Sequence, residues 1–395
     1  MSNTSSSLPS LMASNSITTS TMASSLKLLL FLFFIVVLPF LANAGNMNVI
    51  DRCWRGTPTW AANRQRLAVC SVGFAGKMRM NGGKGLTWYT VTDPADDPVR
   101  PRPGTLRYGA TMLRGKVWIT FERDMQIKLE KPLLVKSFTT IDGRGANVQI
   151  AYGGGILLYN VNNVIIHGLQ IHHCVEQPPG PVVGPGGKIT QLGGLDGDAI
   201  RLVASSKVWI DHNTLYQSQD GLIDVTRGST FITISNNWFR DHDKVMLLGH
   251  DDSYVEDAKM KVTVAFNRFG PNCNQRMPRI RHGYAHVANN LYDGWRDYAI
   301  GGSMGPRVKS EGNLFIASNS SNKKVTRRIP GKFNSWNWQS VNDIFINGAF
   351  FKETGYGRVK PAYNRQQRFK VGSANAVWAL TRNAGALSCS ATAGC

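Results

Sequence analysis

A repeated pattern between residues 163 and 292 constrains the fold of this chain more than any other feature. β-Branched residues are followed by polar positions, then by Asn or Gly and an apolar residue, in five segments: NVIIHGLQI (163–171), KVWIDHNTL (207–215), FITISNNWF (231–239), KVTVAFNRF (261–269) and AHVANNLY (285–292). The asparagines at positions 213, 237, 267 and 290 are separated by 24, 30 and 23 residues, and Asn313 follows after another 23. A period in the low twenties, with short strands, is typical of a coiled β-solenoid.

The segments on either side of the repeats are suited to cover the solenoid, whose end coils would otherwise be exposed. We expect an N-terminal cap region at 45–110, which includes a short helix at Trp60–Cys70, a solenoid core at 111–318 and a C-terminal loop/cap region at 319–395. Asparagines in register at one corner of the coils would bond to one another along the axis. A β-sandwich with chance spacing is the alternative.

The first 44 residues predict a secretory signal peptide. Lys27 precedes the apolar run LLLFLFFIVVLPFLANAG, which ends on the small-x-small cleavage pattern Ala42-Asn43-Ala44. An uncleaved anchor is the weaker alternative, because the run is short and contains Pro39. We therefore expect a secreted, extracellular protein with no stable membrane association after signal cleavage.

Secretion permits disulfides and glycosylation. Six cysteines occur, at positions 53, 70, 174, 273, 389 and 395. Cys53 with Cys70 and Cys389 with Cys395 are close enough in sequence to pair, whereas Cys174 and Cys273 either pair or stay free. The sequon Asn319-Ser320-Ser321 predicts one glycosylation site.

The charge of the chain indicates its class of partner. Lys and Arg number 45 against 25 Asp and Glu, a formal net charge of +20. Such an excess predicts a polyanionic partner: nucleic acid, an anionic membrane or an acidic polysaccharide. Since the protein is expected outside the cell, we exclude nucleic acid and favour the polysaccharide.

An acidic cluster is expected in LDGDAIRLVASSKVWIDHNTLYQSQDGLIDV (195–225). Asp196 and Asp198 are two residues apart and project to one side of an extended segment, and Asp220 and Asp224 follow about one coil later. Four converging carboxylates in a basic chain require a cation, and oxygen ligands without Cys or His indicate Ca²⁺ over zinc. Turn formation by each Asp-Gly pair is the alternative.

Basic residues are expected beside this cluster. Pro278 excludes a helix in RMPRIRHG (276–283), so Arg276 and Arg281 would project from one strand and its turn. Lys244 lies one repeat earlier and would stack near Arg276. Calcium and these cations together would suit a carboxylate polymer. A solvated basic face is the alternative.

These motifs resemble those of plant pectate lyases of polysaccharide lyase family 1. The resemblance covers nearly the whole mature chain, from NVIDRCWR (48–55) to about Phe315, and its specific motifs are IDGRGANV (141–148), DGDAI (196–200), VWIDHN (208–213), DGLIDV (220–225), VMLLGHDDSY (245–254) and RMPRIRHGYAHVANN (276–290). It implies an all-β, right-handed parallel β-helix with an irregular or helical N-terminal cap. The C-terminal tail would pack on this β-helix.

The same resemblance implies the roles of the site residues. The calcium ligands match Asp196, Asp198, Asp220 and Asp224, the catalytic arginine matches Arg276, and the substrate-carboxylate residues match Lys244 and Arg281. Asp211 and His212 match supporting residues. The implied reaction is β-elimination on polygalacturonate, or pectate, of the cell wall by a monomeric enzyme. An arginine base would favour alkaline solution, since a free arginine titrates above ~12.

Three other functions are compatible with part of the sequence. A polygalacturonase-type hydrolase would use two of the carboxylates as acid and base, although no proton donor is evident beside so many cations. A non-catalytic binder of acidic polysaccharide would share the charge and the fold. A pectin lyase acting on methylated polymer would have no need of four aspartates.

Overall fold

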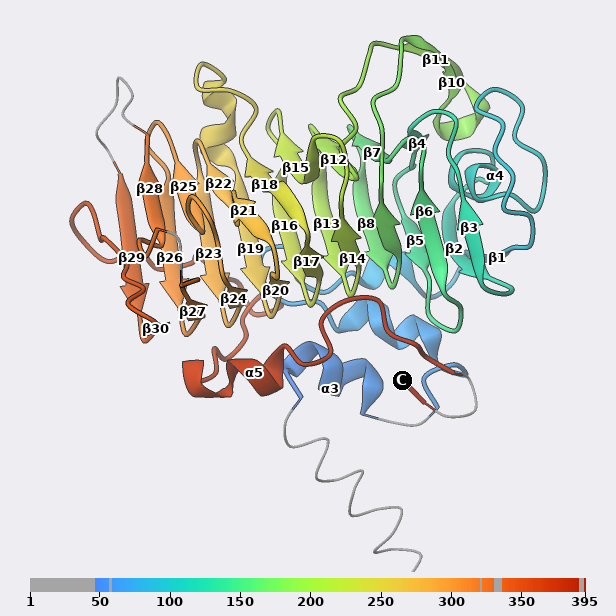
Figure 1. Ribbon diagram of the computed structural model, residues 1–395. Helices are drawn as coiled ribbons and strands as arrows, with labels where there is room; N and C mark the ends of the chain where they lie inside the picture. Colours follow the sequence, from blue (N-terminus) through green and yellow to red (C-terminus); the bar gives the residue numbers. More distant parts are fainter. Residues whose placement is uncertain (1–46, 57–58, 320–321, 330–335, 391–393) are drawn as a thin grey trace, which may run out of the picture. The chain divides into compact units, whose positions relative to one another are not determined.

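Short parallel strands, each hydrogen-bonded to the strand one coil earlier and one coil later, form the body of the protein (Figure 1). The computed structural model describes residues 47–56, 59–319, 322–329, 336–390 and 394–395. The predicted signal peptide, residues 1–44, lies outside the described residues.

The strands belong to three long sheets. Sheet 1 contains, in spatial order, β1 (Leu86–Val91), β2 (Lys116–Phe121), β5 (Thr139–Asp142), β8 (Asn162–His167), β13 (Ser206–Asp211), β16 (Thr230–Ser235), β19 (Lys261–Ala265), β23 (Tyr284–Ala288), β26 (Arg307–Glu311) and β29 (Asn337–Val341). Sheet 2 contains β3 (Met125–Ile127), β6 (Val148–Ala151), β9 (Gln170–His172), β14 (Thr214–Tyr216), β17 (Trp238–Arg240), β20 (Arg268–Phe269), β24 (Leu291–Asp293), β27 (Leu314–Ile316) and β30 (Ile344–Ile346). Sheet 3 contains β4 (Leu133–Leu134), β7 (Ile156–Tyr159), β12 (Ile200–Val203), β15 (Gly221–Thr226), β18 (His242–Leu248), β22 (Arg279–Ile280), β25 (Ile300–Gly302) and β28 (Thr326–Arg328), and β21 (Cys273–Gln275) also pairs with β18.

The chain passes from sheet 1 to sheet 2 and then to sheet 3 in each coil, and the pairing is parallel throughout these sheets. The predicted parallel β-helix is therefore confirmed, and the β-sandwich is excluded. Inward side chains stack in register: Ile210 of β13 aligns with Ile166 of β8 and Ile234 of β16. Burial of these apolar rows is the main force that holds the coils together.

The predicted asparagine ladder is present at the corner between sheets 1 and 2. Each Nδ2 donates to the Oδ1 of the next asparagine at 3.0 Å (Asn213 to Asn237), 3.1 Å (Asn237 to Asn267), 2.9 Å (Asn267 to Asn290) and 3.0 Å (Asn290 to Asn313). All five asparagines are fully buried. The ladder satisfies amide groups that would be costly to bury alone.

The solenoid extends beyond the expected core of residues 111–318 at both ends. β1 pairs with β2 in sheet 1, and β28, β29 and β30 add a further strand to each sheet after residue 318. The first coils are covered by the helix α4 (Leu106–Thr111), whose Leu106 and Ala110 join the interior apolar cluster. The sequence pattern of these outer strands was too weak to place the boundaries.

The N-terminal helical segment lies along the side of the solenoid instead of closing its end. The helix α3 (Val49–Arg55) runs beside the solenoid (Figure 1). Its Ile50 and Trp54 join an apolar cluster with Trp118 and Trp209 of sheet 1. The helix expected at Trp60–Cys70 is wrong in type and extent: a 3₁₀ helix covers Arg64–Val69, and turns precede it. At the other end of the chain the helix α5 (Val377–Leu380) packs on sheet 2 through Val377.

Two disulfides join Cys53 to Cys70 and Cys389 to Cys395, as the spacing predicted. Cys174 and Cys273 are both free and buried. Asn319 is exposed, and its Oδ1 accepts a hydrogen bond from Asn347 Nδ2 at 2.7 Å. Across the described residues, none of the helices has the length and hydropathy that crossing a bilayer requires.

Candidate active site

The outer face of sheet 3 carries the acidic residues that the sequence singled out. Asp196 and Asp198 directly precede β12, Asp220 directly precedes β15, and Asp224 lies within β15. Oxygen atoms of Asp196, Asp198 and Asp220 all lie within 4.8 Å of one another. Asp224 completes the group across Gly221, where an added Cβ would stand 2.7 Å from Asp224 Oδ1 and 2.8 Å from Asp198 Oδ1. We call these four aspartates the acidic cluster.

The carboxylates of the acidic cluster destabilise one another. Burial, followed by the charge of Asp196, raises the pKa of Asp198 to about 7. Burial and the neighbouring Asp198 also raise the pKa of Asp224 well above its usual value. The Asp198 Oδ2 atom is buried and accepts no hydrogen bond. Buried carboxylates in this state can accept a divalent cation, and an all-oxygen donor set suits calcium.

The three predicted cations lie in or directly beside strands of sheet 3. Lys244 of β18 aligns with Gly221 of β15 and with Gln275 of β21, and its Nζ is 2.6 Å from Asp220 Oδ1. Arg276 directly follows Gln275, and its Nε is buried without a hydrogen-bond partner. Lys244 is thus in register with the residue before Arg276, one coil away from it.

Arg281 lies on the other side of β22 from Arg276: Arg276 directly follows β21, and Arg281 directly follows β22. Its Nη1 donates to the Gly249 carbonyl at 3.0 Å, and its Nε is 3.3 Å from Asp252 Oδ1. Arg276 and Arg281 do not project from one strand and its turn, as expected; they lie at the two ends of β22. The cations are thus spread along the cleft face instead of being concentrated at one point.

The structure adds two arginines to the site that sequence reasoning missed. Arg201 of β12 is in register with Asp224, and Arg279 of β22 is in register with Leu247 of β18. Burial and the adjacent Arg281 lower the pKa of Arg279. The sequence signal that could have identified them is the alternation of inward and outward side chains in β12 and β22, which places Arg201 and Arg279 on the outward face.

A hairpin covers sheet 3 on the N-terminal side of the acidic cluster. Residues 176–194, which are rich in Gly and Pro, contain the antiparallel strands β10 (Gly180–Val183) and β11 (Ile189–Leu192). Val182 packs on Leu134 and Leu157 of sheet 3, with Leu192 and Leu195 beside them. The face of sheet 3 is therefore closed over β4 and β7.

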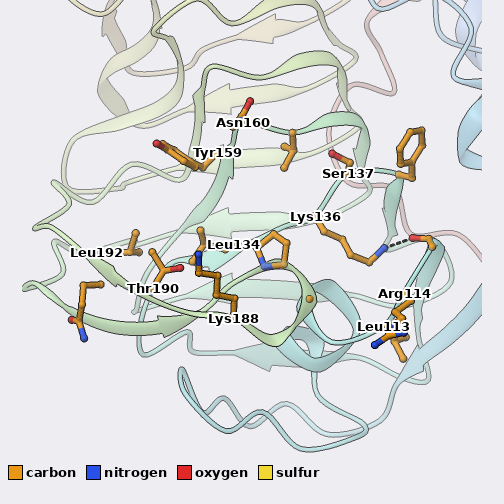
Figure 2. Close-up of a pocket in the computed structure, with 16 residues that line it drawn as sticks. Leu113, Arg114, Leu134, Lys136, Ser137, Tyr159, Asn160, Lys188, Thr190 and Leu192 are labelled. Carbon is orange, nitrogen blue, oxygen red and sulfur yellow. Dashed lines mark hydrogen bonds between the residues drawn. The ribbon is translucent and has the colours of Figure 1, made fainter.

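A hollow of about 890 Å³ lies beside this hairpin, with Lys136, Tyr159, Lys188 and Leu192 among its lining residues (Figure 2). The Lys136 ammonium donates to the Gly115 carbonyl, and burial lowers the pKa of Lys136 to about 8. The hollow contains no member of the acidic cluster and none of the predicted cations. The candidate site is therefore the open face of β12, β15, β18 and β22, where charges of both signs meet.

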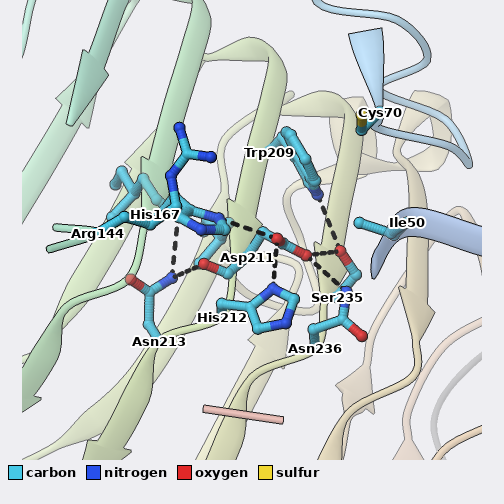
Figure 3. Close-up of polar contacts among 12 residues, drawn as sticks. Ile50, Cys70, Arg144, His167, Trp209, Asp211, His212, Asn213, Ser235 and Asn236 are labelled. Carbon is cyan, nitrogen blue, oxygen red and sulfur yellow. Dashed lines mark hydrogen bonds and ion pairs between the residues drawn. The ribbon is translucent and has the colours of Figure 1, made fainter. Parts of the chain in front are cut away.

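A second group of ionisable residues is buried under α3 and is fully engaged in the fold (Figure 3). His212 lies between two carboxylates, with Nδ1 2.7 Å from Asp211 Oδ2 and Nε2 2.9 Å from Asp51 Oδ1. His167 Nδ1 is 3.0 Å from Asp211 Oδ2, and Ser235 Oγ donates to Asp211 Oδ1 at 2.6 Å. Because these atoms contact one another, the group attaches α3 to sheet 1.

The chain is similar to known pectate lyases. A family profile described as pectate lyase matches residues 123–388. Probable pectate lyase 16 of Arabidopsis thaliana is 53% identical over 351 residues, which cover 88% of this chain and 88% of that protein. Pectate lyase 1 of Cryptomeria japonica is 52% identical over 355 residues, which cover 88% of this chain and 94% of that protein.

Solved structures show the same similarity. The crystal structure of Jun a 1, the major allergen from cedar pollen, matches with a TM-score of 0.82 and 51% identity, covering 86% of this chain and 99% of that one. A pectate lyase from Bacillus sp. N165, solved in complex with trigalacturonate, matches with a TM-score of 0.59 and 25% identity over 80% of this chain and 99% of that one. With the profile covering most of the solenoid and the relatives covering nearly the whole described chain, this protein belongs to the pectate lyase family.

Proposed function

We propose that the protein cleaves de-esterified (1→4)-α-D-galacturonan by calcium-dependent β-elimination and releases oligosaccharides with a 4,5-unsaturated galacturonate at the non-reducing end. The observation that carries this proposal is the acidic cluster, which shares one sheet face with Lys244, Arg276 and Arg281. A site with both charge signs can hold a cation and an anionic polymer together.

Asp196, Asp198, Asp220 and Asp224 would hold the calcium. When bound, calcium would neutralise the carboxylate of the sugar to be cleaved and so make its C5 proton more acidic. Lys244 and Arg281 would bind and orient uronate carboxylates from neighbouring strands. Arg276, as the neutral guanidine, would take the C5 proton, after which the 4-linked oxygen would leave.

The proposal extends to the surroundings of the enzyme. The partner would be polygalacturonate, in line with the trigalacturonate in the Bacillus relative. The sequence favours secretion to the cell wall after removal of residues 1–44, glycosylation at Asn319 and a monomeric state. The proposed domain division is a cap region at 45–110, a catalytic core at 111–318 and a C-terminal region at 319–395. The outer strands of the solenoid then belong to the two regions that flank the core.

The test is the ultraviolet absorbance of the unsaturated product, measured on polygalacturonate at alkaline pH with calcium and with a chelator. We expect a rise that the chelator abolishes. Arg276→Ala should lower the rate roughly 10²–10⁴-fold, the usual loss on removal of a general base. Arg268→Ala is the matched control, since Arg268 pairs with Asp293 at 3.6 Å on sheet 2, away from the site.

Each other function predicts a different result. New reducing ends without absorbance would identify a hydrolase, and bound polymer without either product would identify a non-catalytic binder. Turnover that the chelator leaves unchanged would refute the role of calcium. Circular dichroism and the melting temperature of Arg276→Ala must match those of the control, so that a loss of activity reports on chemistry and not on folding.

A further inference from the structure

Arg201 is a positive charge built into the edge of the acidic cluster. Its Nη1 is 3.0 Å from Asp196 Oδ1 and 3.5 Å from Asp198 Oδ2. Its position in β12 aligns it with Asp224 on one side and with Leu157 on the other. Arg201 therefore contacts the same carboxylates that the proposed function assigns to calcium.

The position of Arg201 is fixed by the sheet and by the hairpin. Leu157 lies under Val182 of β10 in the apolar cluster that fastens the hairpin, so the N-terminal side of Arg201 is covered. The Arg201 side chain is only 22% exposed. A guanidinium held on this side can approach Asp196 and Asp198 but cannot move freely away along β7.

We propose that Arg201 competes with calcium for Asp196 and Asp198 and thereby weakens calcium binding in the absence of substrate. This inference rests on the proposed function, because it assumes that the acidic cluster is the calcium site. Calcium would have to break two ion pairs at this edge and remain beside a like charge, both of which oppose binding. Lys244 acts on the opposite edge through Asp220 at 2.6 Å.

Competition of this kind would couple the metal to the substrate. A uronate carboxylate supplies the negative charge that Arg201 cancels, so substrate should raise the affinity for calcium, and calcium should raise the affinity for substrate by the same factor. Arg201 is thus a positioning residue for the proposed reaction, which keeps the site weakly occupied until the anionic polymer is present.

The test is calorimetric titration of the full mature protein with calcium, without substrate and at low ionic strength. Arg201→Gln should lower the Kd at least about tenfold, because removal of one charge several ångströms from a divalent ion changes its energy by more than thermal energy. Arg201→Lys keeps the charge and should bind near the wild-type Kd. Arg268→Gln, which loses an ion pair on sheet 2, should not differ from wild type.

The outcomes separate this inference from the proposed function. No calcium binding by the wild-type protein would refute the calcium site itself. Binding by the wild type with an equal or higher Kd in folded Arg201→Gln would refute the competition and leave the site intact. If Arg201→Gln does not fold, a structure of the wild type with calcium decides: a guanidinium that keeps its contacts to Asp196 and Asp198 beside the bound ion would overturn the inference.

Discussion

Asp343 ends the asparagine ladder with a carboxylate where the pattern would place another amide. Asn313 Nδ2 donates to Asp343 Oδ1 at 3.0 Å, and the Asn313 backbone N–H donates to the same oxygen at 2.7 Å. These are the contacts that Asn313 itself makes to Asn290. Burial raises the pKa of Asp343 to about 6, although hydrogen bonds from Ser310, Asn313 and Ser340 oppose the shift.

The shift fixes the sign of a pH effect on stability. The folded-state pKa is raised, so the contribution of Asp343 is fully present below its unfolded pKa of roughly 4 and is lost as pH rises through about 6. A shift of about two units corresponds to roughly 3 kcal/mol. Because the side chain is only partly buried, water screening lowers the expected effect to about 2–3 kcal/mol.

We therefore predict that Asp343→Asn stabilises the protein at pH 8 by about 2–3 kcal/mol and has almost no effect at pH 4. The new amide keeps the acceptor for Asn313, and the ladder pattern places its Nδ2 beside the Ser310 carbonyl. For a chain of this length the gain equals roughly 3–4 °C in melting temperature.

Thermal unfolding of wild type and variant across pH 4–8 tests this prediction. Asp124→Asn is the matched control: Asp124 is exposed, accepts one backbone hydrogen bond from Asn147, and should give the wild-type curve. A variant that gains the same stability at pH 4 as at pH 8 would show that packing, and not the buried charge, causes the effect. A variant less stable than wild type at pH 8 would refute the reasoning.

Two further predictions concern the buried polar groups. His212→Gln should lower the free energy of unfolding by about 3–5 kcal/mol at pH 6, since it leaves two buried carboxylates uncompensated. Burial lowers the pKa of His212, but Asp211 and Asp51 raise it to about 9, so this stabilisation is complete below pH ~6.5. The difference from wild type should therefore shrink as denaturation is measured through pH 9. Asn267→Ala should lower the free energy of unfolding in chemical denaturation by about 3–5 kcal/mol, because it leaves donors and acceptors on both neighbouring coils without partners. The control Asn147→Ala, at an exposed position, should stay within about 0.5 kcal/mol of wild type. Equal losses in the two variants would contradict the role of the ladder.

The repeat made the fold and much of the site predictable. In a solenoid, a sequence separation near the period becomes a distance of about one strand spacing, roughly 4.8 Å. Asp220 and Lys244 are separated by 24 residues, like Asn213 and Asn237, and their side chains meet at 2.6 Å. Spacing alone therefore placed a cation beside the acidic cluster, while the chemical roles came from the resemblance to a family.

Features set by contacts outside the repeat could not be predicted in the same way. α3 lies along sheet 1 because outward-facing Trp118 and Trp209 offer it an apolar surface. The periodicity of the sequence does not predict where this helix packs. The position of the hairpin of β10 and β11 depends on the packing of Val182 against Leu134 and Leu157. Within the site, the ion pairs of Arg201 with Asp196 and Asp198 depend on the path of the loop before β12, which the repeat does not fix.

The buried histidine network predicts an upper pH limit for the proposed reaction. Elimination by an arginine base favours alkaline solution, because arginine side chains release a proton only at high pH. The same condition removes the proton of His212, with its pKa of about 9, from between Asp211 and Asp51. The site lies on sheet 3 and the network under α3 on sheet 1, so the two effects act on different parts of the solenoid. Under the proposed mechanism, we therefore expect the rate of elimination to rise with pH until the attachment of α3 weakens.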